Sequence, residues 1–460
     1  MIKNIINHNR VFGLLLYFTL CSSLFTFTGC SHFEEDDLFE ESAALRIVHF
    51  NEQLQNRLVA QSRDENHGWV IQYFVNSDDY DFEGFNLFAH FYDDGKVTLA
   101  GNHRFLRDGN AGQYTEFTSL YEVLKEEGPV LAFNSWNDIL TVFVDPVDPS
   151  AAPDNLLKDG EGMGGDQNLV FLSYEKDNIV FRGERHSAEV RFVPCDRPWQ
   201  TYINDTEANK KYITNSTVTS YYVVCGTDTL YFKNLRSGII TYCERVNDPL
   251  FPSTINCVFT PNGFCLQHRN RIKGTSFQEF SLTPDKSRLM SENDSVQVIA
   301  TWDNYIVNAR NTVWDFDQDR LTDEQKTLLT QIAAEFKKYN KNYALAQVGL
   351  GRSSGADAVK GLVFTFYTNA GKTKTNTAGL SLTTSRPSFG KMQLLYSDSE
   401  KADKNLTTFN NKSNAEALVR QFAATLSGTY DVVPDDYFLP TGCELFGVGG
   451  GNSYLLKQTK

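Results

Sequence analysis

The sequence predicts an α+β protein that is built from antiparallel, β-rich meanders and about three amphipathic helices. Several short runs alternate apolar and polar residues, and residues 219–226 and 229–235 are examples. Such alternation is typical of strands with one buried face. Asp94 and Gly95 lie between two such runs, and an Asp-Gly pair in that position is a strong signal for a hairpin. Three other segments place apolar residues at helical spacing.

Capping signals mark the ends of the predicted helices. The first helix spans residues 42–60. The second begins at Thr322, which forms a capping-box pattern with Gln325. The third begins at Ser413 and stops before Gly428, because glycine commonly follows the last turn of a helix.

A helix followed by a similar strand occurs twice in the chain. The helix at 42–60 precedes the run 68–76, and the helix at 322–340 precedes the run 361–369. Both runs start with glycine and end with asparagine. Either the chain contains two related helix-plus-sheet modules, or two amphipathic strands resemble each other by chance.

The N-terminal residues predict export and lipid anchoring. An apolar run at residues 11–27 follows a basic start, which is typical of a signal peptide. A single-pass anchor is the alternative, because about 17 residues is the lower limit for a membrane span. Thr28 and Gly29 come directly before Cys30, and small residues before a cysteine resemble a bacterial lipobox. Residues 1–29 are therefore predicted to be a lipoprotein signal peptide, with lipid on Cys30.

An acidic segment follows this cysteine. Residues 30–41 are predicted to be a solvated tether, because their carboxylates repel one another. The pattern also resembles the export signal of surface lipoproteins in Bacteroidota. It favours a protein that is anchored in outer-membrane lipid and exposed at the cell surface.

The remaining chain is predicted to form two domains. These are an N-terminal β-rich domain at residues 42–280 and a C-terminal α+β domain at residues 281–460. Within the first, residues 196–275 are expected to be rich in strands. The chain has 43 basic and 57 acidic residues and a net charge of −14, which argues against nucleic-acid partners.

Six cysteines follow the lipidation site, and they are Cys195, Cys225, Cys243, Cys257, Cys265 and Cys443. None belongs to a C-x-x-C pair, so the spacing does not indicate a zinc site. An exported protein can contain disulfides. Cys257 and Cys265 could close a hairpin, and buried free thiols fit the sequence equally well.

A glycine-rich loop at residues 160–165 matches G-x-G-x-x-G. A strand follows it where a dinucleotide site requires a helix, so we reject a nucleotide site. Asp159, Glu161 and Asp166 could instead bind calcium from a tight loop. No other cofactor is predicted.

Two further motifs lack a required part. Ser353 lies in a G-x-S-x-G sequence, but the chain has no histidine after His268 to complete a triad in the expected order. The acidic run from Asp315 resembles the start of an EF-hand loop. Arg320 and Lys326 occupy the positions of its glycine and its last carboxylate. No catalytic residue is predicted.

Aromatic residues make up 13% of the chain. Most are expected in the core, and an exposed tryptophan can stack on a sugar or pack against a protein partner. The candidate ligand-binding residues are Trp69, Trp136, Trp199, Trp302 and Trp314.

Several segments together resemble one family of large surface lipoproteins in Bacteroidota that is classed as a domain of unknown function. The segments are SAALR, GWVIQYF, the hairpin FYDDGKVTLA, GPVLAFNSWNDILTVFVDP and the loop GMGGD. Members of that family are often encoded beside SusC/SusD-like uptake systems, sometimes with a zinc metallohydrolase lipoprotein. The resemblance implies nutrient capture and transfers no catalytic residue.

These observations predict a lipid-anchored accessory protein that binds glycan or peptide for a SusC/SusD-like system without catalysis. A surface hydrolase is the first alternative, and a structural or adhesive surface module is the second. A hydrolase requires a deep cleft with converging titratable groups. A glycan binder requires a groove with exposed aromatic side chains, and a structural module requires neither.

Overall fold

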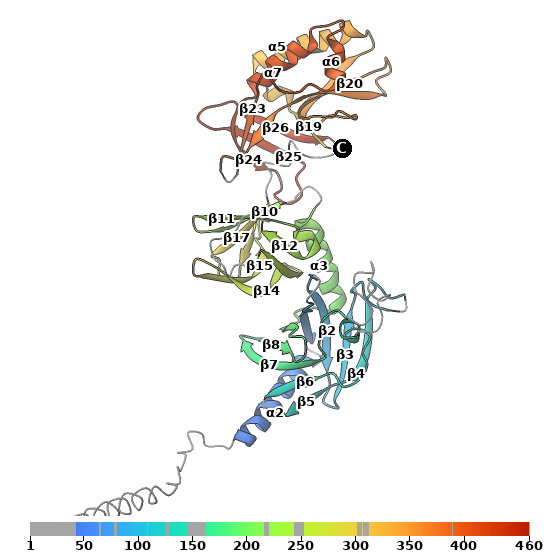
Figure 1. Ribbon diagram of the computed structural model, residues 1–460, viewed down its shortest axis with the longest axis vertical. Helices are drawn as coiled ribbons and strands as arrows, with labels where there is room; N and C mark the ends of the chain where they lie inside the picture. Colours follow the sequence, from blue (N-terminus) through green and yellow to red (C-terminus); the bar gives the residue numbers. More distant parts are fainter. Residues whose placement is uncertain are drawn as a thin grey trace, which may run out of the picture.

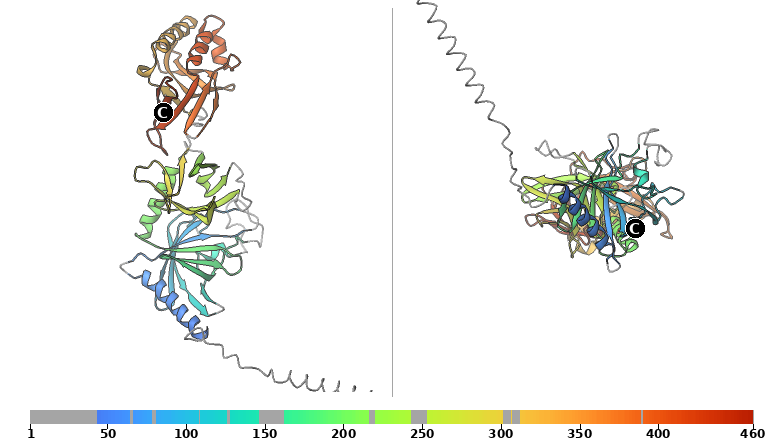
Figure 2. Two further views of the ribbon diagram at one scale, coloured as in Figure 1. Left: turned by 90° about the vertical axis from the view of Figure 1, so that its left-hand side faces the viewer. Right: turned by 90° about the horizontal axis from the view of Figure 1, so that it is seen from below.

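Three β bodies follow one another along the computed structural model of this chain (Figure 1). They are a nine-stranded N-terminal sheet, a closed eight-stranded barrel and a nine-stranded C-terminal sheet. The structure describes residues 43–63, 66–77, 81–107, 109–125, 128–145, 162–215, 220–242, 253–300, 306, 312–388 and 390–459. The left view of Figure 2, turned by 90° about the vertical axis, shows the same succession of bodies along the long axis.

The N-terminal sheet has the strand order β4-β3-β2-β1-β9-β8-β7-β6-β5. Its strands β4 and β5 are consecutive in the chain but lie at the two ends of this order, so the sheet curls toward a barrel. Its elements are α2 (Ala43–Gln61), β1 (Trp69–Phe74), β2 (Phe85–Phe91), β3 (Lys96–Gly101), β4 (Thr115–Leu120), β5 (Glu122–Lys125), β6 (Pro129–Ala132), η1 (Thr141–Phe143), β7 (Asn168–Glu175), β8 (Asn178–Gly183) and β9 (Glu189–Pro194).

The barrel closes because β10 pairs with β17. Its interior is filled by large side chains that include Tyr221, Phe232 and Phe264, all almost fully buried. Its elements are β10 (Ser220–Cys225), β11 (Asp228–Lys233), η2 (Leu235–Ser237), β12 (Ile239–Tyr242), β13 (Thr254–Phe259), β14 (Gly263–Ile272), β15 (Thr275–Leu282), β16 (Leu289–Ser291) and β17 (Val296–Ala300), preceded by α3 (Trp199–Ile213).

The C-terminal sheet has the order β21-β20-β19-β18-β26-β25-β24-β23-β22. Helices α5, α6 and α7 contact one another and strands β19 and β21. The elements are β18 (Val313–Phe316), η3 (Gln318–Arg320), α5 (Asp323–Tyr339), β19 (Ala344–Arg352), β20 (Lys360–Tyr367), β21 (Thr375–Ser381), β22 (Thr383–Ser385), β23 (Lys391–Leu395), α6 (Lys404–Phe409), α7 (Ala415–Thr425), β24 (Gly428–Pro434), β25 (Gly442–Gly447) and β26 (Tyr454–Thr459).

The predicted α+β class is wrong, because the described chain is mostly antiparallel β with few helices. The two runs that suggested a pair of helix-plus-sheet modules do not occupy equivalent places, although the two nine-stranded sheets have the same relative strand order. The run 68–76 contains β1, which lies between β2 and β9, whereas the run 361–369 contains most of β20, which lies between β19 and β21. Helix α2 precedes its sheet in the chain, but α5 is inserted between β18 and β19. Similar amphipathic strands therefore occupy different places.

The predicted domain boundary between residues 280 and 281 falls inside β15 of the barrel. Residues on both sides of it belong to one closed set of strands, so the structural division lies after β17. The local signals for the second helix are confirmed, because Thr322 and Gln325 form both hydrogen bonds of a capping box. The third helix begins at Ala415 rather than Ser413.

Helix α3 was not expected, because residues 196–275 were predicted to be rich in strands. One face of α3 packs on the N-terminal sheet, where the rings of Trp199 and Phe88 are 5.7 Å apart. Further along, the Asn209 amide donates to the barrel carbonyl of Thr260 at 2.9 Å. The Tyr212 hydroxyl then donates to Asp436 of the C-terminal sheet at 2.9 Å. One helix thus contacts all three bodies.

Two more contacts join the C-terminal sheet to α3 and to the barrel. Phe438 is completely buried, and its ring lies 5.6 Å from the ring of Tyr212. The guanidinium of Arg386 lies over the ring of Tyr231 at 4.6 Å. Aromatic and cation–π contacts of this kind stabilise the junction.

The cysteines that the structure describes are free thiols, and all five are buried: Cys195, Cys225, Cys257, Cys265 and Cys443. Of the two alternatives for Cys257 and Cys265, the structure has buried free thiols and no disulfide between them. Cys257 pairs with Leu266 and Cys265 pairs with Val258, so the two thiols are offset by one residue across the hairpin. Successive side chains point to opposite faces of a strand, and the two sulfur atoms therefore lie on opposite sides. Cys243 lies outside the described residues.

None of the helices in the described part of the chain is long and apolar enough to cross a membrane. Cys30 and the rest of residues 1–41, on which the export and lipidation predictions rest, lie outside the described residues.

The buried carboxyl group of Asp315 predicts a stabilising substitution. Neither of its oxygen atoms has a partner among the described residues, and burial raises its pKa to about 7. This pKa exceeds the ordinary value of 3.8, so stability is lost as pH rises from about 4 through about 7. We expect Asp315→Asn to raise the unfolding free energy at pH 8 by about 2 kcal/mol, after allowance for partial exposure. Urea denaturation should show no comparable gain at pH 4, and equal gains at both pH values would contradict this account.

Candidate functional site

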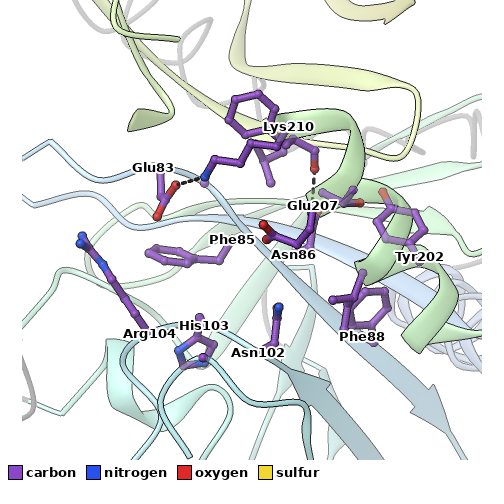
Figure 3. A pocket seen from close by; sticks show the side chains of 16 residues that line it. Glu83, Phe85, Asn86, Phe88, Asn102, His103, Arg104, Tyr202, Glu207 and Lys210 are labelled. Atoms are coloured by element: carbon purple, nitrogen blue, oxygen red, sulfur yellow. Dashed lines mark hydrogen bonds and ion pairs between the residues drawn. The ribbon is translucent and has the colours of Figure 1, made fainter. Parts of the chain in front are cut away.

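A cleft lies where the N-terminal sheet, α3 and the barrel meet, and we call it the junction cleft (Figure 3). Its volume is about 390 Å³. Strand β2 and the residues before it contribute Glu83, Phe85 and Asn86, and the segment after β3 contributes Asn102, His103 and Arg104. Helix α3 contributes Tyr202, Thr206, Glu207 and Lys210, and barrel strand β13 contributes Val258 and Phe259.

Hydrogen bonds between the bodies hold the walls of this cleft together. The Asn86 amide nitrogen donates to the carbonyl oxygen of Phe259 at 2.7 Å. The backbone N–H of Gly84 donates to the carbonyl oxygen of Cys257 at 3.1 Å. Both bonds connect the N-terminal sheet to β13 of the barrel. The two bodies therefore present a formed cleft.

An ion pair crosses the cleft wall. The ammonium nitrogen of Lys210 lies 3.3 Å from a carboxylate oxygen of Glu83 and 4.9 Å from the ring centre of Phe259. Both charged side chains are about one-quarter exposed. Partial burial strengthens an ion pair relative to a fully solvated one, but a pair of this kind contributes modestly to stability. Its main effect here is to orient α3 against the N-terminal sheet.

His103 forms the floor of the cleft in a neutral form. Burial lowers its pKa to about 4. Its Nε2 atom lies 2.9 Å from the carbonyl oxygen of Ile139. A carbonyl can only accept, so Nε2 carries the proton and Nδ1 is left as an acceptor.

The lining side chains carry more acceptors than the protein itself uses. Asn86 Oδ1, Thr206 Oγ1 and His103 Nδ1 are buried and have no hydrogen-bond partner among the described residues. Arg104 and Glu207 are exposed at the cleft and add one charge of each sign. Buried polar atoms are normally paired with protein, water or ligand. The three unpaired atoms are themselves covered, so Arg104 and Glu207 are the charged groups here that a ligand in the cleft can reach.

The structure separates the five candidate tryptophans. Trp69 and Trp314 are 1% and 0% exposed, and they belong to the core. Trp199 is half-buried against Phe88. Trp136 is 49% exposed, and Trp302 lies outside the described residues. Of the four that are described, only Trp136 presents a large part of its ring to solvent.

The structure describes one of the three candidate calcium ligands, Asp166. Asp159 and Glu161 lie outside the described residues. Asp166 is 3% exposed, and its oxygen atoms accept hydrogen bonds from the backbone N–H groups of Arg185, His186 and Ala188. Its carboxylate therefore organises a turn. Elsewhere in the described residues, no group of three or more His, Cys, Asp or Glu residues could hold a metal ion.

Ser353 of the G-x-S-x-G sequence also has a structural role. Its hydroxyl accepts a hydrogen bond from the backbone N–H of Val359 at 3.0 Å, and the residue is buried. This bond closes the turn between β19 and β20. Ser353 is therefore not presented as a nucleophile.

The cleft residues could not be found from local sequence signals, because the cleft is assembled from three distant segments. One local pattern could have indicated helix α3, because several residues at helical spacing form one face of it. Trp199, Tyr202, Ile203 and Thr206 recur at helical spacing after Pro198. Threonine and several charged residues interrupt the apolar pattern, so the sequence did not predict a helix in this segment.

The family described as "Domain of unknown function (DUF4302)" matches residues 35–284, which is more than half of the chain. The chain belongs to the DUF4302 family. The matched residues contain the N-terminal sheet, α3 and most of the barrel, so the junction cleft lies within the DUF4302 region. This agrees with the predicted resemblance to a domain of unknown function.

Among curated proteins, none matches this DUF4302 chain. A solved structure similar to it is Caulobacter crescentus pol III beta, at 10% identity. That match covers 88% of the DUF4302 chain and 96% of the other chain, with a TM-score of 0.11. A score this low establishes no shared fold.

Proposed function

We propose that this protein is a lipid-anchored accessory protein of the bacterial cell surface that binds a glycan or peptide without catalysis. The observation that carries the proposal is the junction cleft, whose walls are hydrogen-bonded between two bodies and whose accessible lining includes the polar side chains of Asn102, Arg104 and Glu207. Pre-organised clefts with a few placed polar groups are typical of ligand sites. The ligand would be passed to a SusC/SusD-like uptake system of a Bacteroidota cell.

The lining chemistry favours a glycan over a peptide. Asn102, Arg104 and Glu207 are lining side chains that remain accessible, and together they offer hydrogen-bond donors and acceptors. A sugar offers many hydroxyl donors on a small ring, and Arg104 and Glu207 can bind further hydroxyl groups.

The proposed anchor would place the three bodies in a fixed order from the membrane. Helix α2 lies at the end of the molecule that is opposite the C-terminal sheet (Figure 2). Lipid on Cys30, which precedes α2 in the chain, would hold the N-terminal sheet nearest the outer membrane. The C-terminal sheet would then face the medium or a partner protein.

Removing a cleft side chain should weaken binding. We expect Asn102→Ala and Arg104→Ala each to lower affinity about tenfold, because each removes one hydrogen-bonding group from the cleft. The measurement is a thermal-shift and calorimetric titration with a panel of oligosaccharides and peptides, since a ligand of the native state raises the unfolding midpoint.

Arg271→Ala is the matched control, because Arg271 is exposed on barrel strand β14 and does not line the cleft. If the cleft variants bind the panel as tightly as the unchanged protein, the junction cleft is not the binding site. Chromatography of the ligand after incubation should show no shortened product. Product formation would replace the proposal with a hydrolase.

A further inference from the structure

Trp136 is held in a fixed orientation although its ring is exposed. The indole N–H donates to a carboxylate oxygen of Asp138. The guanidinium of Arg107 lies over the ring, 5.3 Å from its centre. Arg107 itself donates to Asp145 at 2.8 Å, and both of these side chains are largely buried. One ring face is therefore covered by a fixed cation, and the side chain remains 49% exposed.

An exposed aromatic ring of this kind is pre-organised for stacking. A free tryptophan side chain loses rotamer freedom when it binds a ligand, and this loss reduces affinity. The hydrogen bond to Asp138 and the contact with Arg107 have already restricted Trp136. A flat ring that exposes apolar surface beside hydrogen-bonding groups suits the C–H face of a sugar ring.

One short segment of chain connects the surroundings of Trp136 to the junction cleft. Arg104 lines the cleft, and Arg107 lies over Trp136. Three residues of extended chain span at most about 11 Å, so the backbones at positions 104 and 107 are no further apart than that. Ile139, which follows Trp136 and Asp138 in the chain, is also the hydrogen-bond partner of His103 in the cleft floor. The two surfaces are therefore close neighbours.

We propose that Trp136 is a stacking subsite for one ring of a neutral oligosaccharide whose chain continues into the junction cleft. This inference rests on the proposed function and narrows its ligand to a sugar chain of several units. Neutral sugars are favoured because the side chains around the ring are Arg107, Asp138 and Asp145, which together carry one net negative charge. An acidic sugar would meet two carboxylates here.

The test uses purified protein and four neutral hexasaccharides: cellohexaose, maltohexaose, mannohexaose and xylohexaose. Binding is followed by calorimetry and by quenching of tryptophan fluorescence. We expect one of them to bind and Trp136→Ala to lower its affinity about tenfold. Trp136→Phe keeps an aromatic face and should lose less. Tyr92→Ala is the control, because Tyr92 is an exposed aromatic residue of the same sheet.

Chain length provides a second readout that a folding defect cannot reproduce. The disaccharide of the same sugar cannot occupy both surfaces, so Trp136→Ala and Arg104→Ala should not both weaken its binding. If Arg104→Ala weakens hexasaccharide binding and Trp136→Ala does not, the subsite is wrong and the cleft stands. If only Trp136→Ala has an effect, the continuous path into the cleft is wrong. Absence of binding by all four sugars, with peptide binding in the cleft intact, also overturns the inference.

Discussion

Replacing Asp166 by alanine is expected to lower the free energy of unfolding by about 3–5 kcal/mol. The carboxylate is buried and accepts hydrogen bonds from the backbone N–H groups of Arg185, His186 and Ala188 at 2.9–3.1 Å. Alanine leaves these donors without an acceptor in a site that water does not easily reach. The loss exceeds that of an ordinary hydrogen bond because the acceptor is charged and serves several donors.

Urea denaturation and amide hydrogen exchange of β8 and β9 measure this effect. Asp166→Asn should lose less than alanine, because its amide oxygen still accepts. Asp177→Ala is the control, since Asp177 is an exposed carboxylate at the turn that joins β7 to β8. A loss below about 1 kcal/mol for Asp166→Ala would contradict the structural role. A calcium chelator that strongly destabilised the unchanged protein but had no effect on Asp166→Ala would also contradict the structural role.

Acid should destabilise the protein through His103. Its folded pKa of about 4 lies below the ordinary value of 6.5, so the unfolded chain binds a proton more readily. The stability that depends on neutral His103 is therefore complete above about pH 6.5. It is lost as pH falls toward 4, by about 3 kcal/mol in total. The cause is burial, because a charged imidazole would be placed among the rings of Phe85, Phe105 and Phe143.

The measurement is the free energy of unfolding between pH 6.5 and pH 4 for the unchanged protein and for His103→Leu. The variant should show a shallower fall over this range. His268 provides a comparison of opposite sign, because its hydrogen bond with Glu189 raises its pKa. The stabilisation that this hydrogen bond gives to the folded protein is present at acidic pH and is lost as pH rises. His268→Ala should therefore lower the free energy of unfolding mainly on the acid side. Equal slopes for His103→Leu and the unchanged protein would exclude the proposed linkage.

Local features of the chain were predictable because their signals are contained in a few adjacent residues. Gly95 adopts a positive φ of 80° in the hairpin that joins β2 to β3, as its Asp-Gly pair indicated. The capping box of Thr322 and Gln325 is likewise formed within one helical turn. The predicted helix at residues 42–60 corresponds to α2, Ala43–Gln61.

The exposure of the tryptophan side chains could not be predicted from the sequence. Sequence composition could name Trp69, Trp136 and Trp314 as candidates but could not rank them. Trp69 lies in β1 and Trp314 in β18, and both side chains are buried in hydrophobic core clusters. Trp136 lies in a loop, where the surroundings leave its ring exposed. Exposure depends on which elements pack over a residue, and those elements are distant in the chain.

The sequence by itself determined the hairpins, the helix caps, the acidic charge and the absence of complete catalytic motifs. Only the tertiary structure decided that the strands form two curled sheets and a closed barrel, that α3 joins them, and that β2, α3 and β13 enclose a cleft. The physical reason is the range of the interactions. Turns and caps satisfy backbone groups within a few residues, whereas the closing pair of β10 with β17 and the bond from Asn86 to Phe259 form only when distant segments meet.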